Sequence, residues 1–423
     1  MHTLIRLLRA GTHNSAPEDP NIPSPNRARA RMLSLVETFV ETFSPNDTQP
    51  LYLCSVPGRT EIGGNHTDHQ HGQVLCAAVD ADLLSCAAPN PLQTVRLHSE
   101  GYVPLEIDLS DLQPREEEKG TTAALVRGVA AGIRDSGYPL CGFDACVTSD
   151  IPAGSGLSSS AAFEVLMGNL FNRLCCGSQL SPLQIARIGQ FAEQVYFGKP
   201  CGLMDQVACS LGGVLSIDFK NPEQPAVDPV SCDLSKFGYT LCIINTDSCH
   251  ADLTEDYAAI PREMGEIAAH FGVSVLRDVP EETVREYLPT LRQTYGDRAV
   301  LRTLHFYEEN RRADTEADAL AMDDFPAFLR LVNESGASSI LSLQNIHTDD
   351  PQNQSLALAL ALGRELLGGD GAIRVHGGGF AGTVQAFVPT DVLPRFKEGM
   401  EAVFGPGSCL CLRFRSTGSC FLI

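Results

Sequence analysis

One ten-residue segment constrains the fold of this chain more than any other. It reads Pro-Ala-Gly-Ser-Gly-Leu-Ser-Ser-Ser-Ala over residues 152–161, between a strand predicted at 143–148 and a helix predicted from Ser158 to about Leu174. Its two glycines permit backbone conformations closed to other residues, and its serine hydroxyls are expected to cap free N–H groups at the helix start. The N-terminus of a helix, with the positive end of its macrodipole, attracts anions. The segment therefore predicts a site for nucleotide phosphates, with an ordinary serine-capped helix as the alternative. The residues assigned to the phosphate site are Gly154, Gly156, Ser158, Ser159 and Ser160.

The same segment excludes two other loops that join a strand to a helix. No lysine follows its glycines, so it is not the GxxxxGK[ST] loop of nucleoside triphosphatases. No glycine stands two residues after a candidate serine, so it is not the nucleophile elbow of hydrolases. If the segment binds phosphate, it belongs to the narrower class of phosphate-binding loops that have no such lysine.

A second polar segment, PGRTEIGGNHTDHQHG at residues 57–72, follows a strand predicted at 51–56 and is expected to be a loop at the end of a sheet. Three interpretations stay open. The first is a metal site built from His66, His69 and His71, and the second is a plain surface turn. The third is a polar ligand pocket, in which Asp68 accepts hydrogen bonds from sugar hydroxyls and Arg59 binds a phosphate or a catalytic base through its planar fork.

Two further segments carry candidate chemistry. Asp205, in Cys-Gly-Leu-Met-Asp-Gln, comes twelve residues after Glu193, which lies on a helix predicted at 182–197. A partly buried carboxylate near an arginine could remove or orient a hydroxyl proton, whereas a helix-capping aspartate is the alternative. Residues 374–383 contain a formal GxGxxG, but a strand follows at 384–388 where a dinucleotide-binding unit needs a helix. We interpret this late glycine run as a second wall of the active cleft.

Charge and cysteine content narrow the class of protein. The 423 residues include 31 Lys and Arg against 52 Asp and Glu, a formal charge of −21. Such a chain disfavours nucleic acid and anionic membranes as partners, although a local nest of N–H groups can still bind a small anion. The 15 cysteines are odd in number and mostly lie in apolar stretches such as those around Cys76, Cys146 and Cys242. They predict small buried hydrophobes in a cytoplasmic protein rather than a disulfide framework or a zinc ribbon.

Strands and helices alternate irregularly along the chain, which favours an α+β fold over a doubly wound sheet. The Pro-rich segment 220–230 predicts a domain boundary. The predicted organisation is an N-terminal arm at 1–26, an N-terminal domain at 27–225 and a C-terminal domain at 226–423. No apolar run is long enough for a transmembrane helix, and no secretory signal is expected.

In this order, the segments resemble the superfamily of small-molecule kinases that comprises galactokinase, homoserine kinase, mevalonate kinase and phosphomevalonate kinase. Within it they look most like the galactokinase family. The signature close to PGRVNLIGEHTDYNGG stands here at 57–72, and the phosphate loop close to PxGxGLSSSA stands at 152–161. The catalytic segment close to AExxFAGxPCGIMDQ stands at 192–206, and the GGGFGG-like motif stands as HGGGFAGT at 376–383. The resemblance implies a two-domain kinase fold with mixed sheets and helices and an active site in the cleft between domains.

The resemblance also implies transfer of the γ-phosphoryl group of ATP, with Mg²⁺, to the C1 hydroxyl of D-galactose. Asp205 matches the catalytic aspartate that takes or orients the C1 proton, and Arg59 matches the arginine that keeps it ionised and stabilises developing charge. Ser160 and Glu193 match the Mg²⁺ ligands. The positions that match sugar-binding residues are Asn65, His66, Asp68, Gly202 and Tyr257. A monomer or weak oligomer, with sugar and ATP as ligands, is expected.

The sequence departs from the family pattern at four places. Asn65 replaces a glutamate, His69 a tyrosine, Gly63 an aliphatic residue and Cys249 a basic one. The amide of Asn65 can bond a hydroxyl but carries no charge, so specificity at C6 of the sugar is open. One alternative is a kinase for another sugar, of the N-acetylgalactosamine or arabinose type. A second is a non-catalytic sensor of sugar and ATP, which the complete serine loop disfavours.

Overall fold

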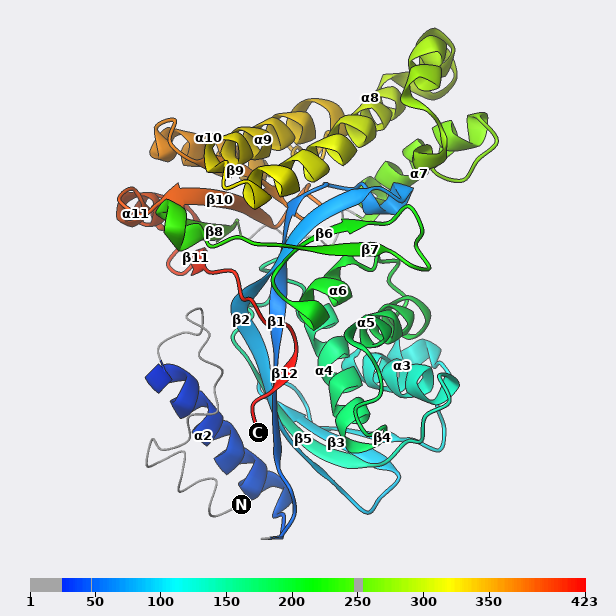
Figure 1. Cartoon of the computed structure of the whole chain (residues 1–423), viewed down its shortest axis with the longest axis vertical. Helices are drawn as coiled ribbons and strands as arrows, with labels where there is room; N and C mark the ends of the chain where they lie inside the picture. The colour runs from blue at the N-terminus through cyan, green and yellow to red at the C-terminus, as the bar shows by residue number, and fades with distance from the viewer. Residues whose placement is uncertain (1–24, 47, 247–253) are drawn as a thin grey trace.

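The computed structural model describes residues 25–46, 48–246 and 254–423, and these residues form two β-sheets with helices packed on them (Figure 1). The larger sheet has the strand order β12-β1-β2-β5-β3-β4, and β6 and β7 extend it beside β2. Its neighbouring strands are antiparallel apart from β3 and β5. The strands of this sheet are β1 (Tyr52–Gly63), β2 (Gln73–Pro89), β3 (Thr94–Ser99), β4 (Leu105–Asp108), β5 (Phe143–Ser149), β6 (Val214–Asp218), β7 (Ala226–Val230) and β12 (Cys420–Phe421).

The smaller sheet is antiparallel with the order β11-β8-β10-β9. Its strands are β8 (Tyr239–Asn245), β9 (Ala372–His376), β10 (Thr383–Pro389) and β11 (Cys409–Leu412). The helices are α2 (Pro25–Phe43), α3 (Thr122–Asp135), α4 (Ser159–Leu174), α5 (Pro182–Phe191), α6 (Met204–Leu211), α7 (Thr254–His270), α8 (Glu281–Ala321), α9 (Phe325–Ser338), α10 (Ser355–Leu367) and α11 (Leu393–Phe404). The α+β class is as expected.

Helices cover both faces of the long strand pair β1–β2, because side chains alternate between the faces of a sheet. Leu53 and Cys86, which are paired in register, face α2 and its buried Val36 and Phe39. Helices α3 to α6 lie on the opposite side of β1 and β2 from α2 (Figure 1). This packing buries the apolar side chains that recur at helical spacing along α2.

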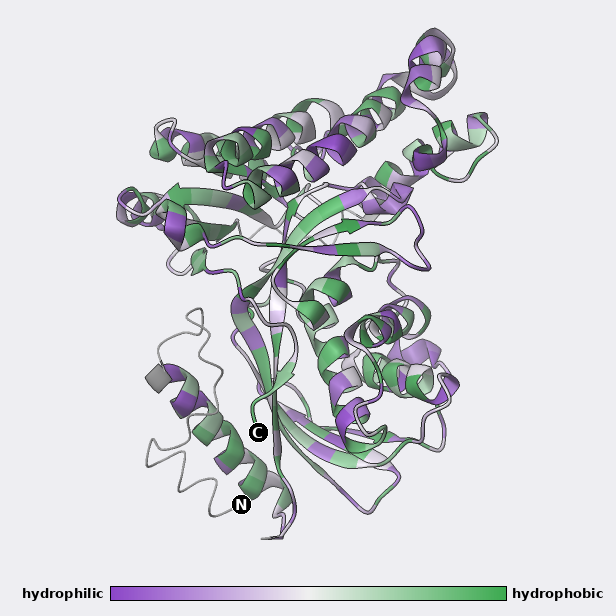
Figure 2. Ribbon diagram, viewed as in Figure 1, coloured by the Kyte–Doolittle hydropathy of each residue, from purple (hydrophilic) through white to green (hydrophobic). Residues whose placement is uncertain are grey.

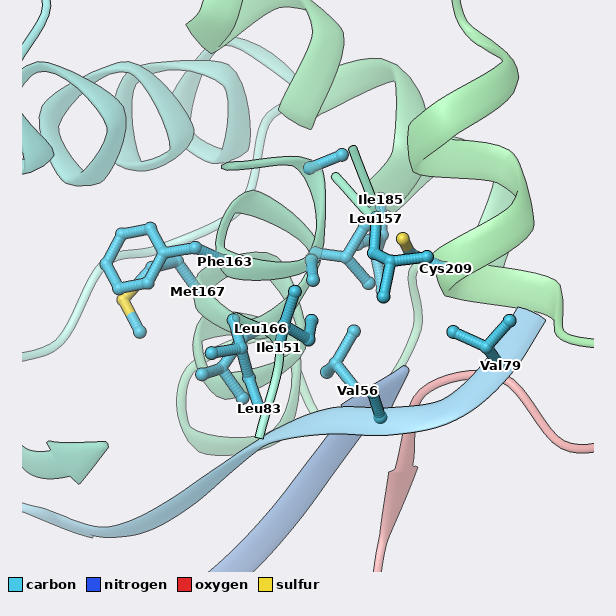
Figure 3. Close-up of a cluster of buried hydrophobic side chains, with 14 of the residues drawn as sticks. Val56, Val79, Leu83, Ile151, Leu157, Phe163, Leu166, Met167, Ile185 and Cys209 are labelled. Carbon is cyan, nitrogen blue, oxygen red and sulfur yellow. The ribbon is translucent and has the colours of Figure 1, made fainter. Parts of the chain in front are cut away.

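The core on the α4 side fixes where the serine loop ends and its helix begins. Figure 3 shows Val56, Val79 and Leu83 of the strands facing Leu157 and Leu166. Each is almost fully buried, and burial of such a side chain contributes about 1.5–3 kcal/mol. Since Leu157 is part of the serine loop and lies two residues before the first residue of α4, its burial in the core holds the end of the loop in place.

Helices α9 and α10 lie over the smaller sheet (Figure 1), and α9 packs directly on β9. Helix α8 packs beside α9 and against the strands β1 and β2 of the larger sheet. Helix α8 carries hydrophilic residues along much of its length (Figure 2) and is kinked at Gly296, where φ is 86°. Among the helices within the described ranges, none is both long and apolar enough to cross a membrane.

Two expectations about local structure are wrong, and a third segment holds more regular structure than its composition indicates. Strand β1 does not close at Pro57-Gly58 but continues to Gly63, because register shifts beside Pro57 and Gly63 absorb the irregularity. The boundary segment 220–230 contains β7, which pairs with β6. The helix predicted at 182–197 changes to a π-helix over Ala192–Phe197.

One pair of cysteines, Cys141 and Cys175, is joined as a disulfide, which the expectation of reduced cysteines did not foresee. The other cysteines in the described part of the chain are free and mostly buried. The division at residue 225 stays a prediction. Nearly all of the predicted N-terminal arm, residues 1–24, and Cys249 lie outside the described residues.

Candidate active site

The predicted segments meet around one cavity of about 300 Å³. The serine loop forms one wall and the late glycine run forms another, as the sequence predicted. Arg59 enters from β1, Asp205 from α6 and Tyr257 from α7. Residues from five separate parts of the chain therefore share this space.

Arg59 and Asp205 form a two-pronged ion pair in this cavity. Arg59 Nε donates to Asp205 Oδ1 at 2.6 Å and Nη2 donates to Oδ2 at 2.8 Å. The Ser158 hydroxyl donates to the same Oδ2 at 2.5 Å, and Arg59 Nη1 donates to the Gly156 carbonyl at 2.6 Å. The pair thus links β1, the serine loop and α6.

The ion pair sets the charge of Asp205. Burial raises the pKa of Asp205, but the Arg59 charge, the Arg59 hydrogen bonds and the Ser158 hydroxyl outweigh it and lower the pKa to about 2. Burial lowers the pKa of Arg59, and Asp205 more than restores it. Asp205 is therefore a carboxylate, and Arg59 a cation, throughout the neutral range.

The serine loop approaches the late glycine run so closely that position 156 requires glycine. A Cβ there would lie 2.8 Å from Thr383 Oγ1 and 3.1 Å from His376 Nδ1, and φ at Gly156 is 69°. Gly154 also has a positive φ, 72°. Ser158 is left-handed and makes no capping bond to the helix backbone, contrary to expectation, since its hydroxyl binds Asp205.

The two predicted Mg²⁺ ligands lie next to each other. Ser160 Oγ donates to Glu193 Oε1 at 3.1 Å. Two neighbouring ligands of an octahedral Mg²⁺ with bonds of about 2.0–2.1 Å lie about 2.9 Å apart. The oxygen pair therefore fits one edge of a Mg²⁺ coordination shell.

Three residues that sequence reasoning missed surround this oxygen pair. Lys199 Nζ donates to Glu193 Oε1 at 3.1 Å and lines the cavity. Gln206 Nε2 bonds Glu164 Oε2 and Glu193 Oε2, each at 2.9 Å. Burial, together with the Glu193 charge, raises the pKa of Glu164 to about 9. A glutamate inside the apolar run Ala-Ala-Phe-Glu-Val-Leu was the available signal for Glu164.

His66 has one ring nitrogen with no hydrogen-bond partner among the residues that the structure describes. Its Nε2 lies 2.9 Å from the Gly378 carbonyl, which can only accept, so Nε2 carries the proton. Burial, with the neighbouring His69, lowers the pKa of His66 to about 4, so the ring is neutral at pH 7. Its buried Nδ1 is an acceptor that no residue in the described ranges satisfies.

Asn65 lies behind the cavity surface, fully buried, and its side chain is occupied by the protein. Nδ2 donates to Glu61 Oε1 at 2.9 Å and to the Gly377 carbonyl at 2.7 Å. Oδ1 accepts from Asn345 Nδ2 at 2.9 Å. The structure thus gives Asn65 a role in fixing the late glycine run, while direct contact with a sugar stays a prediction.

Of the remaining predicted sugar residues, Tyr257 lines the cavity and Asp68 lies against Gly202. A Cβ on Gly202 would lie 2.1 Å from Asp68 Oδ2, so glycine lets Asp68 approach this backbone. The Tyr257 hydroxyl donates to the Gly379 carbonyl at 2.6 Å. Within the part of the chain that the structure describes, His66, His69 and His71 do not gather as a metal cluster. Residues 57–67 are buried, which excludes the plain surface turn.

Comparison with known proteins shows the family of this chain. A family model described as the galactokinase galactose-binding signature matches residues 37–89, and one described as the GHMP kinases N terminal domain matches residues 124–213. A galactokinase of Streptomyces coelicolor is 30% identical over 375 residues, covering 87% of this chain and 92% of the relative. The chain belongs to the galactokinase family.

Solved structures show the same fold as this member of the galactokinase family. The Lactococcus lactis galactokinase complexed with galactose superposes with a TM-score of 0.79 at 23% identity, covering 92% of this chain and 99% of the other. The Methanococcus jannaschii mevalonate kinase superposes with a TM-score of 0.60 at 14% identity, covering 88% of this chain and all of the other. The expected two-domain kinase fold is confirmed by these likenesses.

Proposed function

We propose that this chain is a galactokinase, which transfers the γ-phosphoryl group of ATP to the C1 hydroxyl of D-galactose. The observation that carries the proposal is the Arg59–Asp205 ion pair, which shares its cavity with the serine loop. Phosphoryl transfer depends mainly on positioning and electrostatic stabilisation. A carboxylate held in place beside an anion-binding loop supplies both the positioning and the electrostatic stabilisation. The galactose-binding signature and the relatives named galactokinase support galactose as the sugar.

On the sugar side, Asp68 accepts hydrogen bonds from ring hydroxyls, and the free His66 Nδ1 accepts another. Gly202 leaves room for the Asp68 carboxylate, and Tyr257 lines the cavity. Asn65 acts on the sugar through Gly377 and Glu61, because its own amide is already bonded to them. An unpaired acceptor in a buried site favours a ligand that carries hydroxyl donors.

On the nucleotide side, Gly154, Gly156 and Ser159 belong to the loop that holds the phosphates, at the N-terminus of α4. Ser160 and Glu193 would hold Mg²⁺ through their adjacent oxygens. When bound, Mg²⁺ neutralises charge on the phosphate oxygens.

Asp205 orients the C1 hydroxyl and receives its proton as the phosphoryl group arrives, while Arg59 offsets the negative charge that develops. A carboxylate with a pKa of about 2 is a weak resting base. We therefore infer that Asp205 acts late, when the phosphoryl group has already made the hydroxyl acidic.

The deciding experiment is a steady-state assay with ATP and Mg²⁺ across a panel of D-galactose, N-acetylgalactosamine, L-arabinose and D-glucose. We expect the highest kcat/KM with D-galactose and ADP released in equal amount. Turnover of another sugar with none of galactose would favour the alternative kinase. Saturable binding of sugar and ATP with no turnover of any sugar would favour a sensor.

We also propose a cytoplasmic protein that acts as a monomer or weak oligomer on small molecules, without nucleic acid or membrane partners. The excess of free cysteines supports a reducing compartment. The formal charge of −21 supports the absence of a nucleic-acid partner.

A further inference from the structure

Three cysteines converge on one face of the smaller sheet, where no part of the proposed kinase mechanism lies. Cys411 on β11 is directly paired with Cys242 on β8. Residues opposite each other in an antiparallel pair share a face, and residues two apart on one strand share it too. Cys409 therefore points the same way as the other two. The three sulfur atoms all lie within 4.8 Å of one another.

Packing of small apolar side chains explains only part of this arrangement. Cys242 and Cys409 are buried in the core under α11, but Cys411 is exposed. Strand β11 is the edge of its sheet, so the cluster opens to solvent on the Cys411 side. Because one thiol of the cluster is exposed and lies beside the two buried ones, an ion can enter from solvent on that side. The same opening leaves a position for a further ligand from solvent.

The separation of the sulfur atoms suits a soft metal ion. Thiolates bind Zn²⁺ at about 2.3 Å, so two thiolates of a tetrahedral site lie about 3.8 Å apart. Small side-chain rotations bring sulfur atoms that lie within 4.8 Å to that separation. Lys397 of α11 acts electrostatically on Cys409 and Cys411, and its positive charge offsets thiolate charge.

We propose that Cys242, Cys409 and Cys411 form a binding site for a thiophilic d¹⁰ cation of the Zn²⁺, Cd²⁺ and Cu⁺ class. On binding, the three S–H groups release their protons to solvent and three metal–sulfur bonds form. A divalent ion then carries a net charge of −1 with its three thiolates, and a water molecule completes a tetrahedral shell at the open side. Mg²⁺ is excluded from this site, since it prefers oxygen ligands.

Cadmium titration of the full chain, kept reduced by a phosphine, tests the site. Cd²⁺ bound to thiolates gives a charge-transfer absorption in the ultraviolet, which reports the sulfur ligands directly. The variants are Cys411→Ser, which changes an exposed side chain, and Cys409→Ser. The matched control is Cys232→Ser, which removes a partly exposed free cysteine outside the cluster.

We expect wild type and Cys232→Ser to bind Cd²⁺ at this site with equal affinity, and Cys411→Ser to bind it at least about tenfold more weakly. Kinase activity of Cys411→Ser, which should equal that of wild type, verifies its fold. A melting temperature that rises with Zn²⁺ in wild type but not in Cys411→Ser would agree with the site. Equal charge-transfer absorption and equal affinity in wild type and both cluster variants would overturn the proposal.

Discussion

A Cβ atom on Gly63 would lie 1.7 Å from Oε2 of Glu316, so the glycine at the end of β1 makes room for a glutamate of α8. Glu316 is fully buried, and neither of its carboxylate oxygens has a partner among the residues in the described ranges. Position 63 is one where the sequence departs from the family pattern, and the structure gives the departure a physical reason.

Replacing this glycine tests the relationship. Gly63→Ala should lower the free energy of unfolding by about 1–3 kcal/mol, because the added methyl group overpacks a buried contact. In a Glu316→Ala background the same change should cost far less. Chemical denaturation of the two single variants and the double variant gives the coupling free energy between positions 63 and 316. Additive effects would show that the two side chains do not compete for space.

The buried Glu316 carboxyl should also make stability depend on pH. Burial raises its pKa well above the usual value, and the Glu309 charge adds to this. The folded state then holds a proton that the unfolded state has released. Stability therefore falls as pH rises above about 4.5, by up to about 1.4 kcal/mol per pH unit until the folded-state pKa is reached. The measurement is the free energy of unfolding of wild type and of Glu316→Gln at a series of pH values. As pH rises, the stability of wild type should fall relative to that of the variant. Parallel curves for the two proteins would contradict the prediction.

Removal of the Asp205 charge should abolish most turnover while sparing nucleotide binding. Asp205→Asn keeps the shape of the side chain but can neither accept the C1 proton nor balance Arg59. We expect kcat to fall about 10²–10⁴-fold, with the Kd for ATP nearly unchanged by calorimetry. In wild type, kcat/KM should show no ionisation of Asp205 between pH 5 and 8, because its pKa is lowered to about 2. Near-normal kcat in the variant would refute the assigned role.

Lys199 should contribute to ATP binding, because it lines the same cavity as the serine loop and its ammonium group bonds Glu193. A charge-assisted hydrogen bond contributes about 1.5–3 kcal/mol, so Lys199→Met should raise the KM for ATP roughly tenfold or more, with the KM for sugar little changed. Lys119→Met is the matched control, since Lys119 pairs with Glu116 outside the cavity. An equal effect of the two substitutions would count against a phosphate contact.

Substitution of Gly202 should weaken sugar binding and leave ATP binding unchanged. Gly202→Ala places a methyl group against Asp68 Oδ2 and displaces that carboxylate, so the KM for sugar should rise while ATP binding holds. Gly265→Ala, on α7 with no neighbouring atom within 4 Å of the added carbon, is the control and should leave both constants unchanged. A weaker ATP affinity with unchanged sugar KM in Gly202→Ala would contradict this division.

The sequence motifs predicted which segments meet at the cavity, because local signals such as glycines and serines at a helix start mark backbone that can approach an anion. They could not show what each side chain bonds. Ser158 was predicted to cap a helix, yet it binds a carboxylate from a segment far along the chain. Asn65 matches a sugar ligand by position, but Asn345 and Gly377, both distant in sequence, occupy its amide.

Strand boundaries were predictable only where the pattern was continuous. The Pro-Gly pair at 57–58 is typical of a turn, and only the pairing with β2 shows that the strand absorbs it as an irregularity. Glu164 and Lys199 were missed because their meaning depends on Glu193, which the fold brings beside them. Such pairings over long sequence separations leave no local pattern.

The position of the short strand β12 at the end of the chain has a consequence for folding during translation. Cys420 and Phe421 pair with Ser55 and Cys54, on the strand that also carries Arg59. A ribosome synthesises several hundred residues between the two partners, so this edge of β1 stays open during most of translation. Open strand edges invite pairing with other chains, and long-range contacts form slowly. The strand that carries Arg59 therefore has an unpaired edge, open to aggregation, until the end of synthesis.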